Sequence, residues 1–194
     1  MQASFSGSSK NPVATRRRAA AAALSLVLLA LSTAAHSGPP DAALTRMRDA
    51  ERIAQAHLAK FDTLDFDVYT NQKWDRLAES HSEQILVHYP DGHTSQGLKA
   101  HIDELKPMFV FAPDTRIRVH PVKIATGEWT SVIGVIEGTF SQPMPVGEGK
   151  TVAPTGKKFQ MKMNTVGHWK NGVMDEEYLF WDNANFMKQI GVGQ

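Results

Sequence analysis

Residues 158–182 read KFQMKMNTVGHWKNGVMDEEYLFWD, and this stretch predicts the fold class more strongly than any other part of the chain. Its first half alternates, with Phe159, Met161, Met163 and Thr165 on one side and lysine, glutamine and asparagine on the other. Such alternation is typical of a strand with one buried and one wet face. Asn171-Gly172 then separates two strand-like runs, which predicts a β-hairpin.

Two further strand-like stretches precede this hairpin, at Arg116–Ala125 and Trp129–Phe140. Upstream of them, apolar residues recur with helical spacing over residues 41–61 and 98–108, and a short helix is expected around residues 74–77. Residues 85–89 predict one earlier strand. Helices followed by an antiparallel meander indicate an α+β domain in which the helices pack on one side of a sheet.

The last predicted strand carries carboxylates on an apolar face. Strict alternation places Met174, Glu176, Tyr178, Phe180 and Asp182 together. Burial raises the pKa of a carboxyl group towards the range that is useful for proton transfer near neutral pH. Two bland alternatives stay open: the two carboxylates lie at wet strand ends, or Asp182 caps a helix formed by residues 183–190.

The first 37 residues predict a secretory signal peptide. They contain Arg16-Arg17-Arg18, an apolar run from Ala19 to Leu31 and then small residues, without any acidic side chain. We expect cleavage after Ala35 or Ser37, a domain over residues 38–194, and export to the periplasm by a Sec or a twin-arginine signal. An uncleaved membrane anchor is the alternative, although the run is short for a spanning helix.

The charge and the composition of the chain exclude several classes of function. The whole chain of 194 residues has 21 basic and 20 acidic side chains, but four of the basic ones precede residue 38, which leaves 17 against 20, a net charge of −3. This balance argues against a nucleic-acid partner. The chain has no cysteine, so disulfides, thiol nucleophiles and cysteine-based zinc sites are excluded.

Five short motifs follow one another along the chain: His88-Tyr89-Pro90-Asp91-Gly92, Ala112-Pro113-Asp114-Thr115-Arg116, Gly138-Thr139-Phe140, Pro154-Thr155-Gly156-Lys157, and Asn171-Gly172 leading to Glu176-Glu177-Tyr178 and Trp181-Asp182. Taken together and in this order, they resemble the SnoaL-like polyketide cyclase family, also called ester cyclase-like, of the nuclear transport factor 2-like superfamily. The resemblance covers most of residues 60–190. It implies a cone-shaped, strongly curved antiparallel sheet wrapped around the N-terminal helices, with an apolar pocket inside.

The resemblance also implies a chemistry. Family cyclases close a ring by an intramolecular aldol reaction without a metal or an organic cofactor, using an aspartate on the final strand together with a nearby histidine. Asp182 matches that aspartate and His168 matches the histidine. Removal of a proton next to a carbonyl group needs a modest base and a hydrogen-bond donor for the enolate. The resemblance implies that Asp182 is the base and that His168 is either the donor or the residue that tunes Asp182.

The hairpin register leaves the position of His168 open. A two-residue Asn171-Gly172 loop pairs Lys170 with Val173 and puts His168 on the face opposite Asp182. A three-residue loop that includes Lys170 would instead bring His168 to the face of Asp182.

Other side chains are candidates for contact with a substrate. His88 lies on a predicted strand, and the expected pocket residues include aromatic, methionine and carboxylate side chains: Trp74, Phe109, Met161, Met163, Glu176, Tyr178 and Phe180. His81, His88, His93 and His101 have spacings that match no zinc motif, and no carboxylate completes a site in the sequence, so no metal is expected.

These features predict an exported acid/base enzyme, an aldol-type cyclase, isomerase or dehydratase, that acts on a small apolar carbonyl compound without a cofactor. The alternative is a non-catalytic periplasmic binding protein for a hydrophobic small molecule. A third hypothesis is a scaffold whose sheet face forms a homodimer. After signal cleavage we expect no stable membrane anchor.

Overall fold

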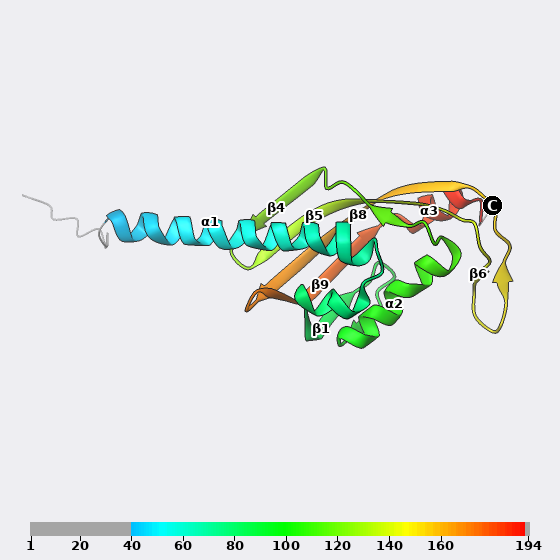
Figure 1. Ribbon diagram of the computed structural model, residues 1–194, viewed down its shortest axis with the longest axis horizontal. Helices are drawn as coiled ribbons and strands as arrows, with labels where there is room; N and C mark the ends of the chain where they lie inside the picture. The colour runs from blue at the N-terminus through cyan, green and yellow to red at the C-terminus, as the bar shows by residue number, and fades with distance from the viewer. Residues whose placement is uncertain (1–39, 193–194) are drawn as a thin grey trace, which may run out of the picture. The chain divides into compact units, whose positions relative to one another are not determined.

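A sheet built around the predicted hairpin organises the domain (Figure 1). The computed structural model describes residues 40–192, so the predicted signal segment, residues 1–37, lies outside the described residues. β8 (Lys158–Lys170) pairs antiparallel with β5 (Trp129–Thr139) on one side and with β9 (Val173–Trp181) on the other. The hairpin is therefore confirmed.

Four shorter strands complete this sheet. β1 (His81–His88) lies beside β9, and β2 (Thr94–Gln96) pairs with β1, while β3 (Arg116–Ile117) and β4 (Val122–Thr126) both pair with β5. β1 runs parallel to β9, whereas the other described pairs are antiparallel. The antiparallel meander predicted from the sequence is thus part of a mixed sheet. A separate ribbon, β6 (Met144–Pro145) and β7 (Thr151–Val152), lies in the Pro/Gly-rich loop.

The stretch Arg116–Ala125, predicted as one strand, is broken into β3 and β4. The break contains His120 and Pro121, and proline lacks the backbone N–H that a strand ladder requires. The His120 side chain is 1% exposed. The break therefore turns a histidine towards the interior.

The β8–β9 hairpin has the two-residue loop of the first register. Asn171 and Gly172 have φ of 54° and 80°, as a type I′ turn requires, and Lys170 pairs with Val173. Two residues later the register shifts, because Trp169 pairs with Met174 but His168 pairs with Glu176. Asp175 is left as an extra residue, and a bulge of this kind exchanges the two faces of a strand.

The bulge overturns the predicted face of the last strand. Met174 is buried, but beyond the bulge it is Glu177 and Leu179 that point inwards. Glu176, Tyr178 and Phe180 lie on the outer face, where Phe180 is 53% exposed. On β8 the alternation holds, since Phe159, Met161 and Thr165 are buried.

The helices lie where the helical periodicity predicts them, with one addition. α1 (Pro40–Thr63) runs directly into a π-helical turn, η1 (Leu64–Tyr69), and a 3₁₀ helix, η2 (Trp74–Glu79), follows. α2 (Leu98–Phe111) continues beyond the predicted end and contains Pro107. No helix among the described residues is both long and apolar enough to cross a membrane.

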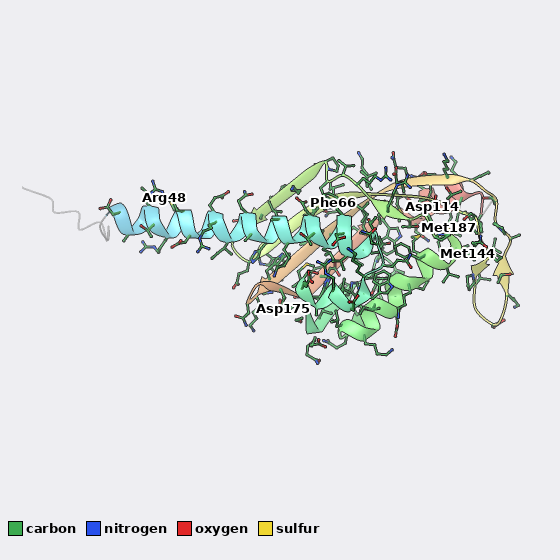
Figure 2. All side chains as sticks on the ribbon, viewed as in Figure 1. Arg48, Phe66, Asp114, Met144, Asp175 and Met187 are labelled. Atoms are coloured by element: carbon green, nitrogen blue, oxygen red, sulfur yellow. The ribbon has the colours of Figure 1, made fainter. Side chains whose placement is uncertain are left out.

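Only the second half of α1 belongs to the core. Ala54, Leu58 and Phe61 are buried, whereas Leu44 and Met47 are exposed. Figure 1 shows α1 extending beyond the sheet at its N-terminal end, and Arg48 lies on that extension in Figure 2. The C-terminal end of α1 therefore carries the residues that the interior uses.

The last helix is capped as one of the sequence alternatives predicted. α3 covers Asn183–Ile190, and the Asp182 side chain accepts a hydrogen bond of 2.9 Å from the backbone N–H of Asn185. Such an N-cap satisfies one of the free amides at a helix start.

Candidate active site

The interior of the domain contains a cavity of about 330 Å³. Met144 and Met187 both line it and are labelled in Figure 2. Most of the lining is apolar and comes from η1, α2, β5, β8 and β9; it includes Leu64, Leu105, Met108, Phe111, Ile136, Met161, Met163, Leu179 and Trp181. A cavity of this size and composition suits a small, largely apolar molecule.

Two polar clusters open on the cavity, and the first is a relay of three side chains. His120 Nε2 lies 2.7 Å from Asp65 Oδ2, and His120 Nδ1 lies 2.8 Å from Asp62 Oδ1. Asp65 lines the cavity, while Asp62 lies nearer the surface, where Lys123 donates a hydrogen bond to its second oxygen. We call Asp65, His120 and Asp62 the aspartate–histidine relay.

Local backbone irregularities bring the relay together. Asp65 lies in the π-helical turn η1, and π-helical segments are frequent at functional sites. His120 comes from the break between β3 and β4. Gly134 on β5 leaves room for both, because a Cβ atom there would lie 3.3 Å from Asp65 Oδ2 and 3.6 Å from His120 Cδ2.

The relay shifts the pKa values of its members in different directions. Burial raises the pKa of Asp65, and the hydrogen bond and charge of His120 offset this only in part. Burial alone would lower the pKa of His120, but Asp65 and Asp62 together outweigh burial and raise this pKa. Despite its partial burial, the pKa of Asp62 is lowered by hydrogen bonds from Lys123 and His120. The hydrogen bond between Asp65 and His120 therefore joins a carboxyl group and an imidazole whose pKa values are both raised.

The second cluster consists of His81, His101 and Glu177, and all three side chains are at most 5% exposed. Glu177 Oε2 lies 3.3 Å from His101 Nε2 and 3.7 Å from His81 Nε2. Each of the three residues offers one ligand atom, and these atoms lie within 4.8 Å of one another. Among the described residues this is the group that could hold a metal ion; we call it the His–His–Glu cluster.

Burial controls the charge state of this cluster. It lowers the pKa of His101 to about 4, so this imidazole is neutral at neutral pH. Burial also acts to raise the pKa of Glu177, but the neighbouring imidazoles of His81 and His101 outweigh it and lower that pKa. Burial raises the pKa of Tyr89, whose hydroxyl lies 3.1 Å from His101 Nδ1, to about 12. The cluster therefore presents the carboxylate of Glu177 beside the neutral imidazole of His101.

Residues of both clusters line the same cavity. Asp65, His81, His101 and Glu177 all line the cavity. The charge of Glu177 contributes to the raised pKa of Asp65, while His81 lowers it. A substrate in the cavity would therefore meet a carboxyl–imidazole pair and the His–His–Glu cluster together.

The structure places both residues that the sequence assigned to catalysis outside this cavity. Asp182 is exposed and caps α3. His168 lies on the outer face of the sheet, where its Nδ1 is 2.6 Å from Asp175 Oδ1. The two-residue loop and the bulge together put His168 on the side of Glu176.

Four of the expected substrate contacts are also on the outer face. His88 Nε2 lies 2.9 Å from Glu176 Oε1, and the imidazole stacks on Tyr178 with a centroid distance of 4.2 Å. The Tyr178 hydroxyl donates to the same Glu176 oxygen. With the exposed Phe180, these residues form a surface group, so the prediction that Glu176, Tyr178 and Phe180 face the interior is wrong.

The remaining expected contacts divide into two pairs. Trp74 and Phe109 pack edge to face, with their ring centroids 5.6 Å apart. Neither residue is among those that line the cavity. Met161 and Met163 line the cavity, as the alternation along β8 predicts.

Sequence reasoning missed the clusters for identifiable reasons. It grouped His81 with His101 but found no carboxylate, because only the bulge at Asp175 turns Glu177 inwards. Pro121 is the signal that could have shown the strand break beside His120. Asp65 carried no signal, because it continues the helical pattern of α1.

Comparison with known proteins agrees with this architecture. The family model of the SnoaL-like polyketide cyclases matches residues 62–190. No protein with a curated description matches the chain. A candidate SnoaL-like polyketide cyclase from Jannaschia sp. CCS1 superimposes with a TM-score of 0.63 at 18% identity, covering 73% of this chain and 96% of the other.

Two further solved structures show the same fold. IdmH from Streptomyces antibioticus, a candidate polyketide cyclase, has a TM-score of 0.60 at 21% identity over 70% of this chain and 99% of its own. A nuclear transport factor 2-like protein of unknown function from Burkholderia pseudomallei K96243 has a TM-score of 0.56 at 15% identity over 71% and 98%. At these identities the similarity establishes the fold.

Proposed function

Because the chain belongs to the SnoaL-like polyketide cyclase family, we propose that it is an acid/base enzyme that moves a proton on a small, largely apolar carbonyl compound bound in the cavity. The reaction class is an aldol-type cyclisation, an isomerisation or a dehydration. The observation that carries the proposal is the aspartate–histidine relay, since it aims a buried carboxyl group with a raised pKa into an apolar cavity.

Asp65 is the proposed base. Its carboxylate removes a proton from the carbon next to the substrate carbonyl, and the electron pair of the broken C–H bond forms an enolate. In the aldol case the enolate carbon bonds to a second carbonyl carbon of the same molecule. The proton held by Asp65 then passes to the new alkoxide, so no proton is gained or lost overall.

His120 and Asp62 tune this step. A charged His120 stabilises the Asp65 carboxylate, and Asp62 stabilises the charge on His120. Burial acts in the opposite direction and keeps Asp65 basic enough to accept a proton. The mostly apolar lining lowers the local dielectric constant, which strengthens each of these interactions.

The test is exchange of substrate protons with solvent deuterium. Apolar ketones and 1,3-diketones that fit a cavity of about 330 Å³ are incubated with the protein in D₂O and followed by NMR. We expect exchange next to the carbonyl group, and a loss of about 100-fold or more in Asp65→Asn, which is the usual size of a general-base contribution. Exchange that is unchanged in Asp65→Asn would overturn the assignment.

The predominance of apolar lining residues favours one alternative, a non-catalytic binding protein for a hydrophobic small molecule. This alternative expects a ligand that co-purifies and is released on denaturation. It also expects Asp65→Asn to retain the ligand, with no deuterium exchange in either protein.

Export to the periplasm is part of the proposal. Its support is the order of basic, apolar and small residues in positions 1–37. Fractionation of cells that produce the full chain should give a periplasmic protein whose mass fits cleavage after Ala35 or Ser37. A full-length protein in the membrane fraction would contradict it.

A further inference from the structure

We infer that the His–His–Glu cluster binds one divalent transition-metal ion, with His81 Nε2, His101 Nε2 and Glu177 Oε2 as ligands and with an open coordination position towards the cavity. Metal binding itself does not depend on the proposed function; only the use of the ion in the reaction does.

The distances between the ligand atoms suit a bound metal ion. An ion about 2.1 Å from each ligand in tetrahedral geometry separates its ligand atoms by ~3.4 Å. The Glu177 oxygen lies 3.3 and 3.7 Å from the two imidazole nitrogens, on either side of that value. All three ligand atoms lie within 4.8 Å of one another, so side-chain rotations that bring the two imidazole nitrogens closer would complete the site.

Two of the three ligand atoms have no hydrogen-bond partner. His81 Nε2 and Glu177 Oε2 are buried and make no hydrogen bond. Unpaired polar atoms in a protein interior are rare and costly. A cation between the three side chains would satisfy both atoms at once.

Each imidazole of the cluster also has a hydrogen-bond partner at its far ring nitrogen. His81 Nδ1 lies 2.9 Å from the Ser80 hydroxyl, and His101 Nδ1 lies 3.1 Å from the Tyr89 hydroxyl. Hydrogen bonds to the far ring nitrogen orient a metal-binding histidine and fix which nitrogen offers its lone pair. In both residues Nε2 is the nitrogen that faces Glu177, and it offers its lone pair in the tautomer whose Nδ1–H donates to the hydroxyl.

The donor set indicates the class of metal. Two imidazoles and one carboxylate suit zinc or iron(II), whereas magnesium and calcium prefer oxygen ligands alone. Sites with three protein ligands leave a position for water or substrate. Here that position would face the cavity shared with Asp65, so the ion could polarise the carbonyl oxygen of the compound that Asp65 deprotonates.

The experiment measures zinc binding without any substrate. Protein freed of metal with a chelator and then dialysed is titrated with zinc by calorimetry, and with cobalt(II) by visible absorption. We expect one equivalent per chain, a rise in Tm with zinc, and the visible bands of cobalt in a site of low coordination number. Less than a tenth of an equivalent, with no change in Tm, would overturn the inference.

Variants assign the ligands. Glu177→Gln keeps the side-chain volume and should weaken zinc binding by about 100-fold or more, and Tyr89→Phe, which acts through His101, should weaken it by about 10-fold. His88→Ala and His168→Ala, on the outer face, are controls and should bind as the wild type does. Equal binding in Glu177→Gln, or equal loss in the controls, would overturn the assignment, and circular dichroism verifies that each variant is folded.

The outcomes separate the two claims. Absent zinc binding with intact, Asp65-dependent deuterium exchange overturns the metal site alone. Zinc binding without exchange on any carbonyl compound overturns the proposed function alone.

Discussion

Asp62 connects the aspartate–histidine relay to the surface, because its carboxylate contacts both His120 and Lys123. In Asp62→Asn, His120 loses one of the two charges that raise its pKa, so it carries its proton less often. The Asp65 carboxylate is then less stabilised, and its pKa rises further.

The acid limb of the pH–rate profile should therefore move to higher pH in Asp62→Asn. The other charged groups that act on Asp65, Glu177 and His81, are unchanged in this variant. The measurement is kcat/KM for deuterium exchange against pH. A uniform loss of rate, without movement of the acid limb, would assign Asp62 a structural role only.

Asp182 should matter for stability and not for chemistry. Removal of an N-cap side chain costs about 1 kcal/mol, so Asp182→Ala should lower the free energy of unfolding by about that amount. Denaturant titration measures the loss, and Asp182→Asn, which can still cap the helix, is the control. A fall in exchange activity at full stability would return Asp182 to the site.

At the scale of single residues, the sequence located side chains with suitable chemistry but not their orientation. The cap by Asp182 was foreseen as an alternative, because residues 183–190 have helical spacing. The inward turn of Glu177 was not, because it depends on one unpaired residue, Asp175, that alternation alone does not reveal.

The β8–β9 pair is the element on which the cavity depends. Gly167 lies against β9, and a Cβ atom at this position would come within 2.5 Å of Met174 Sδ and 3.2 Å of Thr130 Oγ1. Both contacts are with buried side chains, so the added methyl group has little room.

Gly167→Ala should therefore destabilise the protein by about 1–3 kcal/mol, as overpacking of a core does. Lys162→Ala, on the exposed side of the same strand, should change stability by less than about 0.5 kcal/mol. Thermal and denaturant unfolding compare the two. Equal stability of both variants would mean that the hairpin accommodates the methyl group by a shift.

The elements themselves were largely predictable. Runs of β-branched and aromatic residues predicted β5, β8 and β9, and helical spacing predicted α1 and α2, because each pattern is local. The parallel pairing of β1 with β9 was not predictable in this way, since pairing between distant strands leaves no local periodicity.

Across the whole molecule, the outer face of the sheet carries several exposed apolar side chains as well as polar ones such as Lys158 and Lys162. Phe180 and Val122 lie in one row across the strands, and Tyr178 and Ile124 lie in the next. Phe180, Val122 and Ile124 are each more than 40% exposed. Large exposed apolar side chains gathered on one face of a sheet can mark an interaction surface.

We expect a homodimer through this face. Light scattering of residues 38–194 should give twice the chain mass, and Phe180→Glu should give the monomer mass with the cavity intact. Lys158→Glu, at an exposed position of the neighbouring strand away from these rows, is the charge control. A monomeric wild type at micromolar concentration would contradict this expectation.

One comparison decides whether Asp65 or Asp182, the aspartate at the end of the last strand, removes the substrate proton. Solvent deuterium exchange on the same carbonyl compound is measured for wild type, Asp65→Asn and Asp182→Asn. We predict wild-type exchange in Asp182→Asn and a loss of about 100-fold or more in Asp65→Asn. The reverse pattern, with exchange lost only in Asp182→Asn, would contradict it.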